Sequence, residues 1–491
     1  MNISLFLQMA ADACPDRPAV THNGNNYTYG QLFNAAKHAA QIFEKTGCQY
    51  VSLLDESSPA VPIALMGAAM AGIPYVPLNY RLSKEQLLPL FERISPAYLI
   101  TGKRDDNYDF EDWIVEESND FLHKCLKAEH SDYFKDVDPN EVAVQLFTSG
   151  TTGTPKAALL RHEHLVSYIL GSVEFMGAME EEAALVSVPP YHIAGISAVM
   201  SNIYACRQVV QLPNFNASEW LKLCQDHSVT SAFLVPTMLT RIIEELNENQ
   251  TLESLQSIAY GGGKMPVPVI QKALSRFPDV SFTNAYGLTE TSSTITLLGP
   301  DDHRDAHNSD NESVKARLGS VGKALPSVEI EIRDEEGKPL EANEPGEIYV
   351  RGPQVSGEYE GRSVLDNEGW FPTRDAGYLD NEGYLFLSGR ADDVIVRGGE
   401  NMSPGEIEDL LHEHPAIKDA AAVGIPSEEW GETVGLAVVL NSGHEVSDDA
   451  ICSLIRDHLR SSRVPEIVRF VDELPYNETG KLLRRVIKEW F

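Results

Sequence analysis

Short apolar segments recur along most of this chain, and each ends close to a proline or a glycine. An amphipathic run at residues 29–44 is followed by apolar segments at 50–54, 98–101 and 142–148. Apolar runs that alternate with helix-period segments are typical of βαβ units, which build a mostly parallel sheet covered by helices. We therefore predict an α/β fold, in which ligands gather beyond the carboxyl ends of the strands. Further strands are predicted at 184–188, 208–212, 232–235 and 257–260.

The pattern changes in the second half of the chain. Residues 300–316 are polar and predict an exposed loop, whereas residues 328–332 and 347–350 alternate like the strands of a β-rich subdomain. A chain of 491 residues exceeds the usual domain size of about 100–200 residues.

A compact unit is predicted after Gly389. Its predicted strands are 420–423 and 436–440, and its predicted helices are 406–412 and 448–459. We predict a large N-terminal domain of parallel-type sheets, helices and the β-rich subdomain over residues 1–389. A small mobile α+β domain follows over residues 390–491.

Charge excludes one class of partner. The chain has 39 Lys and Arg against 73 Asp and Glu, a formal net charge of −34 at pH 7. Such a field repels a phosphate backbone, and no basic patch is apparent, so we expect no nucleic-acid partner. A polyanionic ligand must then be held by backbone N–H groups, a metal ion and a few selected cations.

Cysteine spacing and hydropathy indicate the cellular setting. The six cysteines form no C-x-x-C pair, and the first basic residue is Arg17, so the basic start of a secretory signal is absent. Residues 61–78 carry no charge, but prolines and glycines interrupt them, which predicts a buried helix followed by a short strand instead of a membrane span. We expect a cytoplasmic protein with reduced thiols.

A hydroxyl-rich segment follows the strand predicted at 142–148. Residues 148–156 read Thr-Ser-Gly-Thr-Thr-Gly-Thr-Pro-Lys. Its glycines allow close approach of the backbone to a ligand, its hydroxyls can donate, and Lys156 supplies a positive charge, so the segment suits a polyphosphate. It is not a P-loop, because Pro155 precedes the lysine. Composition alone leaves a flexible surface linker as an equal alternative.

This segment resembles the phosphate loop of the adenylate-forming superfamily, which includes acyl- and aryl-CoA ligases, luciferases and the adenylation domains of peptide synthetases. Five further motifs follow in the order typical of the family. They are Pro-Tyr-His-Ile-Ala-Gly at 190–195, Tyr-Gly-Leu-Thr-Glu at 286–290, Thr-Arg-Asp-Ala-Gly-Tyr at 373–378, Gly-Arg-Ala-Asp-Asp at 389–393 and Glu-Thr-Gly-Lys at 478–481. The chain is similar to the acyl-CoA synthetase branch from about residue 28 to its end.

The resemblance implies a nucleotide site. Phosphates would be bound by Thr148, Ser149, Gly150, Thr151, Thr152, Gly153, Thr154 and Lys156. Tyr286 would stack on adenine, supported by the backbone of Gly262, Gly263 and Lys264. Asp375 and Arg390 would hold the ribose hydroxyls. Taken alone, Tyr286 could be a buried aromatic and the Asp–Arg pair a surface salt bridge. The family has a small residue and then proline where this chain has Lys264 and Met265, so that pocket wall differs.

The resemblance also assigns the catalytic groups. Glu290 would bind Mg²⁺, and the hydroxyl of Thr289 would meet the phosphate. Lys481, which alone would be taken for a solvated tail lysine, would bring its charge to the carboxylate and the α-phosphate. Its distance in sequence from the phosphate loop implies closure of the small domain over the large one.

His192, Gly261 and Asn284 would line the pocket for the acid. A core histidine bonded to a backbone carbonyl is the alternative for His192. Asp392 would be the hinge, and Gly399 would line the pantetheine channel after the domain turns, although an ordinary β-turn would look the same. Apolar neighbours and three consecutive glycines favour a hydrophobic fatty or aryl acid.

These implications describe a two-step ligase with ATP, Mg²⁺ and coenzyme A. The acid is activated to an acyl-adenylate and then transferred to coenzyme A, by a monomer or a homodimer. A stand-alone enzyme that loads an acyl-carrier protein is the first alternative. A nucleotide-binding regulator without catalysis is the second, and the presence of Glu290 and Lys481 argues against it.

Overall fold

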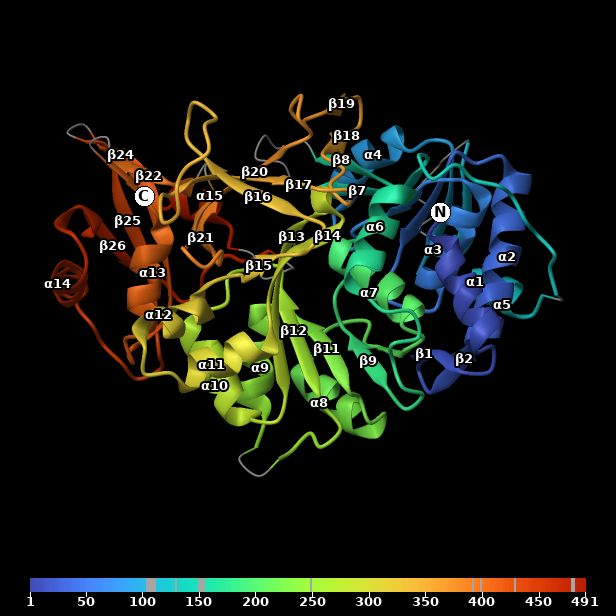
Figure 1. Cartoon of the computed structure of the whole chain (residues 1–491), viewed down its shortest axis with the longest axis horizontal. Helices are drawn as coiled ribbons and strands as arrows, with labels where there is room; N and C mark the ends of the chain where they lie inside the picture. The colour runs from blue at the N-terminus through green and yellow to red at the C-terminus, as the bar shows by residue number, and fades with distance from the viewer. Residues whose placement is uncertain are drawn as a thin grey trace.

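The computed structural model describes residues 1–102, 112–128, 130–148, 155–247, 250–390, 393–397, 400–427, 430–477 and 482–491. In these residues, helices pack on four β-sheets (Figure 1). The predicted α/β class is confirmed.

The largest sheet has nine strands in the order β15-β14-β13-β12-β11-β9-β10-β1-β2. Its six inner strands from β13 to β1 are parallel, and β2, β14 and β15 join antiparallel at the edges. The strands are β1 (Pro18–His22), β2 (Asn25–Thr28), β9 (Ala183–Val186), β10 (Gln208–Gln211), β11 (Ser231–Leu234), β12 (Ser257–Gly261), β13 (Ser281–Leu288), β14 (Ser293–Leu298) and β15 (Lys323–Ala324). Helices α8 (Ala217–Asp226), α9 (Pro236–Glu245) and α10 (Val267–Arg276) contribute to its core.

An eight-stranded sheet has the order β19-β18-β8-β7-β4-β3-β5-β6. Five consecutive strands of this sheet, β7, β4, β3, β5 and β6, are parallel, whereas β8, β18 and β19 are antiparallel to their neighbours. The strands are β3 (Tyr50–Leu54), β4 (Tyr75–Pro77), β5 (Ala97–Thr101), β6 (Ile114–Glu117), β7 (Val142–Thr148), β8 (Lys156–Arg161), β18 (Glu358–Tyr359) and β19 (Arg362–Ser363). The accompanying helices are α1 (Ser4–Ala13), α2 (Tyr29–Thr46), α3 (Ala60–Ala71), α4 (Lys84–Arg93), α5 (Ser118–Leu126), α6 (His162–Ser172) and α7 (Ile193–Tyr204).

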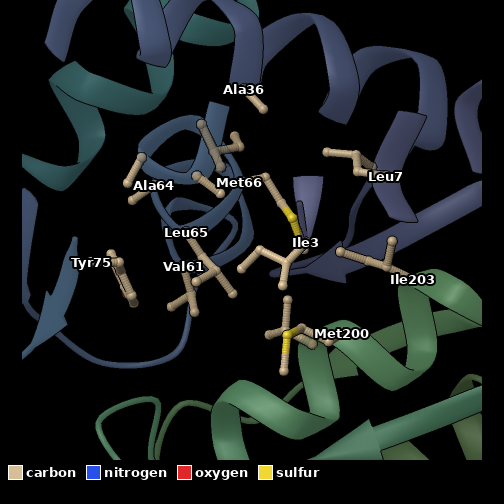
Figure 2. Close-up of a cluster of buried hydrophobic side chains, with 14 of the residues drawn as sticks. Ile3, Leu7, Ala36, Val61, Ala64, Leu65, Met66, Tyr75, Met200 and Ile203 are labelled. Atoms are coloured by element: carbon tan, nitrogen blue, oxygen red, sulfur yellow. The ribbon is translucent and has the colours of Figure 1, made fainter. Parts of the chain in front are cut away.

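Helix α3 is the centre of the largest core, and all of its residues are buried. Figure 2 shows Ile3, at the start of α1, between Leu65 of α3 and Met200 of α7. The uncharged stretch predicted as a buried helix and a short strand is therefore confirmed as α3 and β4. Among the described residues, no helix is long and apolar enough to cross a membrane.

The β-rich subdomain is confirmed as a four-stranded antiparallel sheet, in the order β16-β17-β20-β21. Its strands are β16 (Glu329–Arg333), β17 (Gly346–Arg351), β20 (Phe371–Leu379) and β21 (Leu385–Arg390). The hairpin of β18 and β19 lies between β17 and β20 in sequence but pairs with β8 of the eight-stranded sheet.

The exposed loop predicted over residues 300–316 is wrong. This segment contains helices α11 (Pro300–Asn308) and α12 (Glu312–Lys315) and enters the 3₁₀ turn η2 (Ala316–Gly319). Pro300 at the first helical position and acidic residues in the first turn favour a helix start. His303, although polar, is buried and bonds both Gly299 O and the Tyr260 hydroxyl, which anchors α11 to β12.

The last sheet contains strands from Ile395 onward, in the order β23-β22-β25-β24 with β26 paired to β25. Its strands are β22 (Ile395–Arg397), β23 (Glu400–Met402), β24 (Ile417–Ser427), β25 (Gly431–Leu440) and β26 (Ile467–Phe470). Helices α13 (Pro404–His412), α14 (Asp448–His458) and α15 (Arg484–Lys488) accompany it. Figure 1 shows this unit in orange and red, at the opposite end of the molecule from α1 and α2. The boundary between the two domains, predicted between residues 389 and 390, stays a prediction.

Candidate active site

The two ends of the hydroxyl-rich segment lie side by side. Strand β7 ends at Thr148, strand β8 begins at Lys156, and these two residues are opposite each other in the antiparallel pair. The Thr148 hydroxyl donates to Lys156 O at 3.4 Å. Ser149, Gly150, Thr151, Thr152, Gly153 and Thr154 lie outside the described residues.

Glu290 lies in a 3₁₀ turn, η1 (Thr289–Thr291), that directly follows β13. Its backbone carbonyl accepts from Ser356 N at 2.9 Å, from Gly357 N at 3.3 Å and from the Ser356 hydroxyl at 3.2 Å. Its side chain is buried, and carboxylate oxygen Oε1 accepts from the Tyr359 hydroxyl. Thr289, the preceding residue, is half-buried. Both the backbone and the carboxylate of Glu290 are therefore held by the segment that leads into β18.

Tyr286, Asp375 and Arg390 form a bonded chain. The Tyr286 hydroxyl donates to Asp375 Oδ2 at 2.6 Å, and Arg390 Nη1 lies 3.1 Å from Asp375 Oδ1. Burial and the neighbouring Asp375 carboxylate raise the pKa of Tyr286, so its hydroxyl stays a donor. Asp375 and Arg390 are also direct partners in the β20–β21 pair. Three residues that the sequence assigned to one nucleoside are thus in contact.

The glycine run begins at Gly261, the last residue of β12, and close backbone approach requires a glycine there. A Cβ on Gly261 would lie 2.2 Å from Ala285 O of the neighbouring strand β13, so a larger residue would displace that strand. Gly262 has a φ of +78°, and Gly263 is half-buried. The Lys264 side chain points to the C-terminal unit, where its Nζ lies 2.8 Å from Asp409 Oδ2 of α13.

Of the three residues expected to line the acid pocket, two lie in the adjacent parallel strands β12 and β13, and the third lies between β9 and α7. His192 follows β9 and precedes α7, and its ring centroid lies 4.5 Å from that of Tyr191. Gly261 ends β12. Asn284 lies in β13, where it is buried and its Nδ2 donates to Ser320 O at 3.2 Å. Because the parallel strands β9, β11, β12 and β13 adjoin one another, their carboxyl ends share one edge of the sheet.

Comparison with known proteins decides the family. Residues 7–360 match the AMP-binding enzyme family, and residues 406–481 match the AMP-binding enzyme C-terminal domain. The chain belongs to the AMP-binding enzymes. The expected adenylate-forming ligase is therefore confirmed at the level of the family and the enzyme class.

Relatives of this AMP-binding enzyme include a 2-succinylbenzoate–CoA ligase of Bacillus cereus, 31% identical over 99% of this chain and 98% of the relative. Among solved structures, an o-succinylbenzoate CoA synthetase of Bacillus subtilis in complex with the acyl-adenylate intermediate OSB-AMP is 29% identical, with a TM-score of 0.84. The match covers 98% of this chain and 97% of that chain. The same synthetase in complex with ATP and a magnesium ion is 28% identical, with a TM-score of 0.83, and the match covers 98% and 99% of the two chains.

Several expected site residues of this AMP-binding enzyme lie outside the described residues, namely Asp392, Gly399 and Lys481 in addition to the phosphate-loop residues 149–154. Their neighbours are described. Arg484, three residues after Lys481, has its Nε 3.6 Å from Asp393 Oδ2, one residue after the expected hinge. Arg484 Nη2 also lies 2.8 Å from Glu408 Oε2 of α13. Segments near the expected hinge and near the expected catalytic lysine are therefore joined.

Sequence reasoning missed two residues next to this site. Tyr359 contacts Glu290, and Arg93 donates from Nη1 to Pro155 O at 2.7 Å and from Nε to Glu360 Oε2 at 3.1 Å. Neither residue lies in a motif, and both reach the site through contacts between segments far apart in sequence. From sequence, the position of Tyr359 next to Glu290 could have been inferred only by predicting that the two-residue strand β18 pairs with β8.

Proposed function

We propose that this AMP-binding enzyme uses ATP and Mg²⁺ to activate an aromatic carboxylic acid and then transfers the acyl group to coenzyme A. The observation that carries the proposal is the bonded chain of Tyr286, Asp375 and Arg390. Its first member, Tyr286, lies near the end of β13, the strand that leads into the turn of Glu290. The relatives named 2-succinylbenzoate–CoA ligases support the same reaction.

Each residue near the nucleotide has a role that its contacts allow. A carboxylate accepts about four hydrogen bonds, so Asp375 can accept from ribose hydroxyls while it keeps Tyr286 and Arg390. Tyr286 is half-buried, and its ring is assigned to stack on adenine. Lys156, at the base of the hydroxyl-rich segment, supplies positive charge to the phosphates in a protein of net charge −34.

The residues present fit a magnesium ion held together with ATP. In the described part of the chain, no group of three or more His, Cys, Asp or Glu side chains could hold a metal by itself. Mg²⁺ bound with nucleotides usually takes one or two protein carboxylates, phosphate oxygens and water. Glu290 meets this requirement, because its Oε1 accepts from Tyr359 and its Oε2 has no hydrogen bond to another described residue. When bound, Mg²⁺ would counter the charge on the phosphates.

In the first step, a carboxylate oxygen of the acid attacks the α-phosphorus, and pyrophosphate leaves with the bonding electron pair. Lys481 supplies charge to the attacking carboxylate and to the α-phosphate oxygens. In the second step, the sulfur of coenzyme A attacks the acyl carbon, its proton is lost, and AMP leaves. Between the two steps, the small domain (residues 390–491) rotates about Asp392. This rotation brings Gly399 to the pantetheine channel.

The relatives favour an aromatic acid over a fatty acid, and the apolar surroundings of the pocket residues suit either. The relatives are named for an aromatic acid. The edge of the sheet where the pocket residues lie is also apolar, since the Phe233 ring comes within 3.5 Å of the Cβ position of Gly261 and Val235 lies 3.4 Å from that of Gly262. Coenzyme A and ATP as substrates, with six free thiols, favour the cytoplasm.

A pyrophosphate-exchange assay with a panel of acids tests the first step. We expect exchange with aromatic acids that exceeds exchange with straight-chain fatty acids of similar size. Coenzyme A and an acyl-carrier protein are then supplied separately to the enzyme with its best acid. If a thioester forms with the carrier protein and not with coenzyme A, the carrier protein is the acceptor of the acyl group. If no acid supports pyrophosphate exchange, the proposed function is rejected.

Lys481→Ala separates the two steps. The variant should lose pyrophosphate exchange and keep nearly all of its thioester formation from a supplied acyl-adenylate, because the lysine charge is needed only during adenylation. Lys488→Ala, a change in the last helix α15, is the control and should keep both activities. Equal loss of both steps in Lys481→Ala would contradict the assigned role.

A further inference from the structure

Tyr359 lies beside the base of the hydroxyl-rich segment. It is the second residue of β18, and it pairs with Ala158 of β8, two residues after Lys156. The next residue extends this contact, because Glu360 N donates to Ala157 O at 3.0 Å. The backbone of Tyr359 is therefore fixed against the strand that leaves the segment.

The side chain of Tyr359 connects two residues of opposite charge. Its hydroxyl donates to Glu290 Oε1, and the Lys156 ammonium lies 5.8 Å from its ring centroid. That distance is within the range of about 6 Å for a cation–π contact. A single side chain thus hydrogen-bonds the carboxylate assigned to Mg²⁺ and lies within cation–π range of the cation assigned to the phosphates.

Among the described residues, Tyr359 is the one that hydrogen-bonds the carboxylate of Glu290. Ser356 and Gly357 hold the backbone carbonyl of Glu290, and these bonds do not reach its side chain. A buried carboxylate needs a hydrogen-bond donor, and the Tyr359 hydroxyl donates to Oε1. With Oε1 held, the orientation of the carboxylate is fixed and Oε2 is available to a ligand within the described part of the chain.

We propose that Tyr359 is a positioning residue for magnesium-bound ATP. Its hydroxyl orients Glu290 toward the metal, and its ring face orients Lys156 toward the polyphosphate. This inference rests on the proposed function, because it takes Glu290 as the Mg²⁺ carboxylate. Tyr359 acts through Glu290 and Lys156 and does not itself contact the nucleotide.

Two substitutions separate the two contacts. Tyr359→Phe keeps the ring under Lys156 and removes the hydroxyl, whereas Tyr359→Leu removes both. Tyr349→Phe is the matched control, because the Tyr349 ring lies in β17 under Arg333, away from Glu290. Circular dichroism of each full-length variant checks that the fold is kept.

The decisive measurement is ATP binding by isothermal titration calorimetry, with Mg²⁺ and with a chelator. A hydrogen bond to a charged group corresponds to about tenfold in affinity, so Tyr359→Phe should bind ATP about tenfold more weakly with Mg²⁺ and equally well without it. Tyr359→Leu should be weaker under both conditions, and Tyr349→Phe should match the wild type. In pyrophosphate exchange, Tyr359→Phe should need more Mg²⁺ for half-maximal rate, while acyl transfer from a supplied acyl-adenylate is unchanged.

Two results would overturn the inference in distinguishable ways. If the wild type binds ATP and Tyr359→Phe shows the same Mg²⁺ dependence, or weakens equally with and without Mg²⁺, Tyr359 does not position the metal carboxylate. If the wild type binds no ATP under either condition, the proposed function fails together with the inference.

Discussion

Asp375 occupies a position where one carboxylate serves several donors. It accepts from Tyr286, pairs with Arg390 and has its own backbone N–H bonded to the Thr373 hydroxyl at 3.1 Å. These contacts leave little freedom for its side chain. A ligand that uses Asp375 therefore meets an acceptor that is already oriented.

Asp375→Asn should weaken ATP binding. An amide replaces one acceptor oxygen by a donor, and the loss of a hydrogen bond to a charged group costs about 1.5–3 kcal/mol, or roughly 10- to 100-fold in affinity. Calorimetric titration with ATP measures the effect. Asp301→Asn, on the exposed surface of α11, is the control, and an Asp375→Asn affinity equal to that of the control would exclude a ribose contact.

Glu408 and Arg484 form a buried ion pair in the C-terminal unit. Arg484 contacts the Glu408 carboxylate with both terminal nitrogens, and Ala422 N donates to Glu408 Oε1 at 2.9 Å. Burial raises the pKa of Glu408, but the Arg484 charge and the hydrogen bonds outweigh it, so the net pKa lies below the ordinary 4.5. The carboxylate is therefore charged in the folded protein.

Glu408→Gln should destabilise the protein by up to about 3–5 kcal/mol, because the buried Arg484 loses its closest carboxylate and keeps only Asp393 and the carbonyl of Ala422. Urea unfolding followed by circular dichroism measures the change. Glu413→Gln, at the exposed end of the same helix, should stay within about 0.5 kcal/mol of the wild type. Similar unfolding midpoints for the two variants would contradict a stabilising pair.

The same pair predicts a pH dependence. Since the folded pKa of Glu408 lies below the unfolded value, its contribution to stability is present above about pH 4.5 and is lost as the pH falls through the folded pKa. Unfolding midpoints of wild type and Glu408→Gln, measured from pH 7 downward, should converge below pH 4.5. Parallel curves over that range would contradict the linkage.

At the scale of elements, the close contact between α2 and α3 depends on Gly67. A Cβ on Gly67 would lie 2.7 Å from Ala39 Cβ and 3.0 Å from Ala36 O. Alanine favours a helix over glycine by about 1 kcal/mol, whereas overpacking a core costs about 1–3 kcal/mol. At Gly67 the cost of overpacking exceeds the gain in helix propensity, because the added Cβ would be too close to a backbone oxygen, which cannot move aside as a side chain can.

Gly67→Ala should therefore lower the free energy of unfolding by up to about 2 kcal/mol. The same change at Gly171 in α6, an exposed residue whose added Cβ would meet Ser327 Oγ at 3.3 Å, should be neutral or stabilising. Thermal unfolding of both variants tests the pair. A more stable Gly67→Ala would mean that α2 and α3 can separate without cost.

How much the sequence could predict also differs between elements. The apolar runs at 50–54 and 142–148 coincide with β3 and β7, because a strand buried on both faces needs a mostly apolar segment, with Ser52 and Gln145 as buried polar exceptions. Helix α11 was missed because its inner face is formed by His303 and Ala306, which do not make an apolar pattern. Strand β18 could not be predicted, since two residues have no period and their pairing with β8 spans about two hundred residues of sequence.

The same limit applies to the site. Tyr286, Glu290 and Asp375 were found through motifs, and the structure brings Tyr286 and Asp375 into contact. Tyr359 and Arg93 lie in no motif, and only the folded chain places them beside the others.

At the scale of the whole molecule, Lys264 and Asp409 join the large sheets to the C-terminal unit. The pair is half-exposed, with 44% and 50% of the two side chains accessible. Exposed pairs contribute about 0.2–1 kcal/mol and weaken with salt. An interaction free energy of this size contributes little to folding, but it is large enough to shift the equilibrium between two orientations of the C-terminal unit.

Lys264→Met should leave the free energy of unfolding within about 1 kcal/mol of the wild type and change the ratio of adenylation to thioester formation. The change in ratio should vanish at high salt, where the wild-type pair is screened as well. Lys315→Met removes an exposed pair with Glu312 inside the large unit and should leave the ratio unchanged. Equal effects of Lys264→Met on both half-reactions would exclude a role in orientation.

The hairpin of β18 and β19 lies in sequence between β17 and β20 of the four-stranded sheet, but it pairs with the eight-stranded sheet. Its tyrosine reaches Glu290. Damage to the packing of the four-stranded sheet would thus be transmitted to the phosphate side of the site. A genetic screen that selects for weakened ATP binding should collect substitutions there in addition to those in residues that touch the nucleotide.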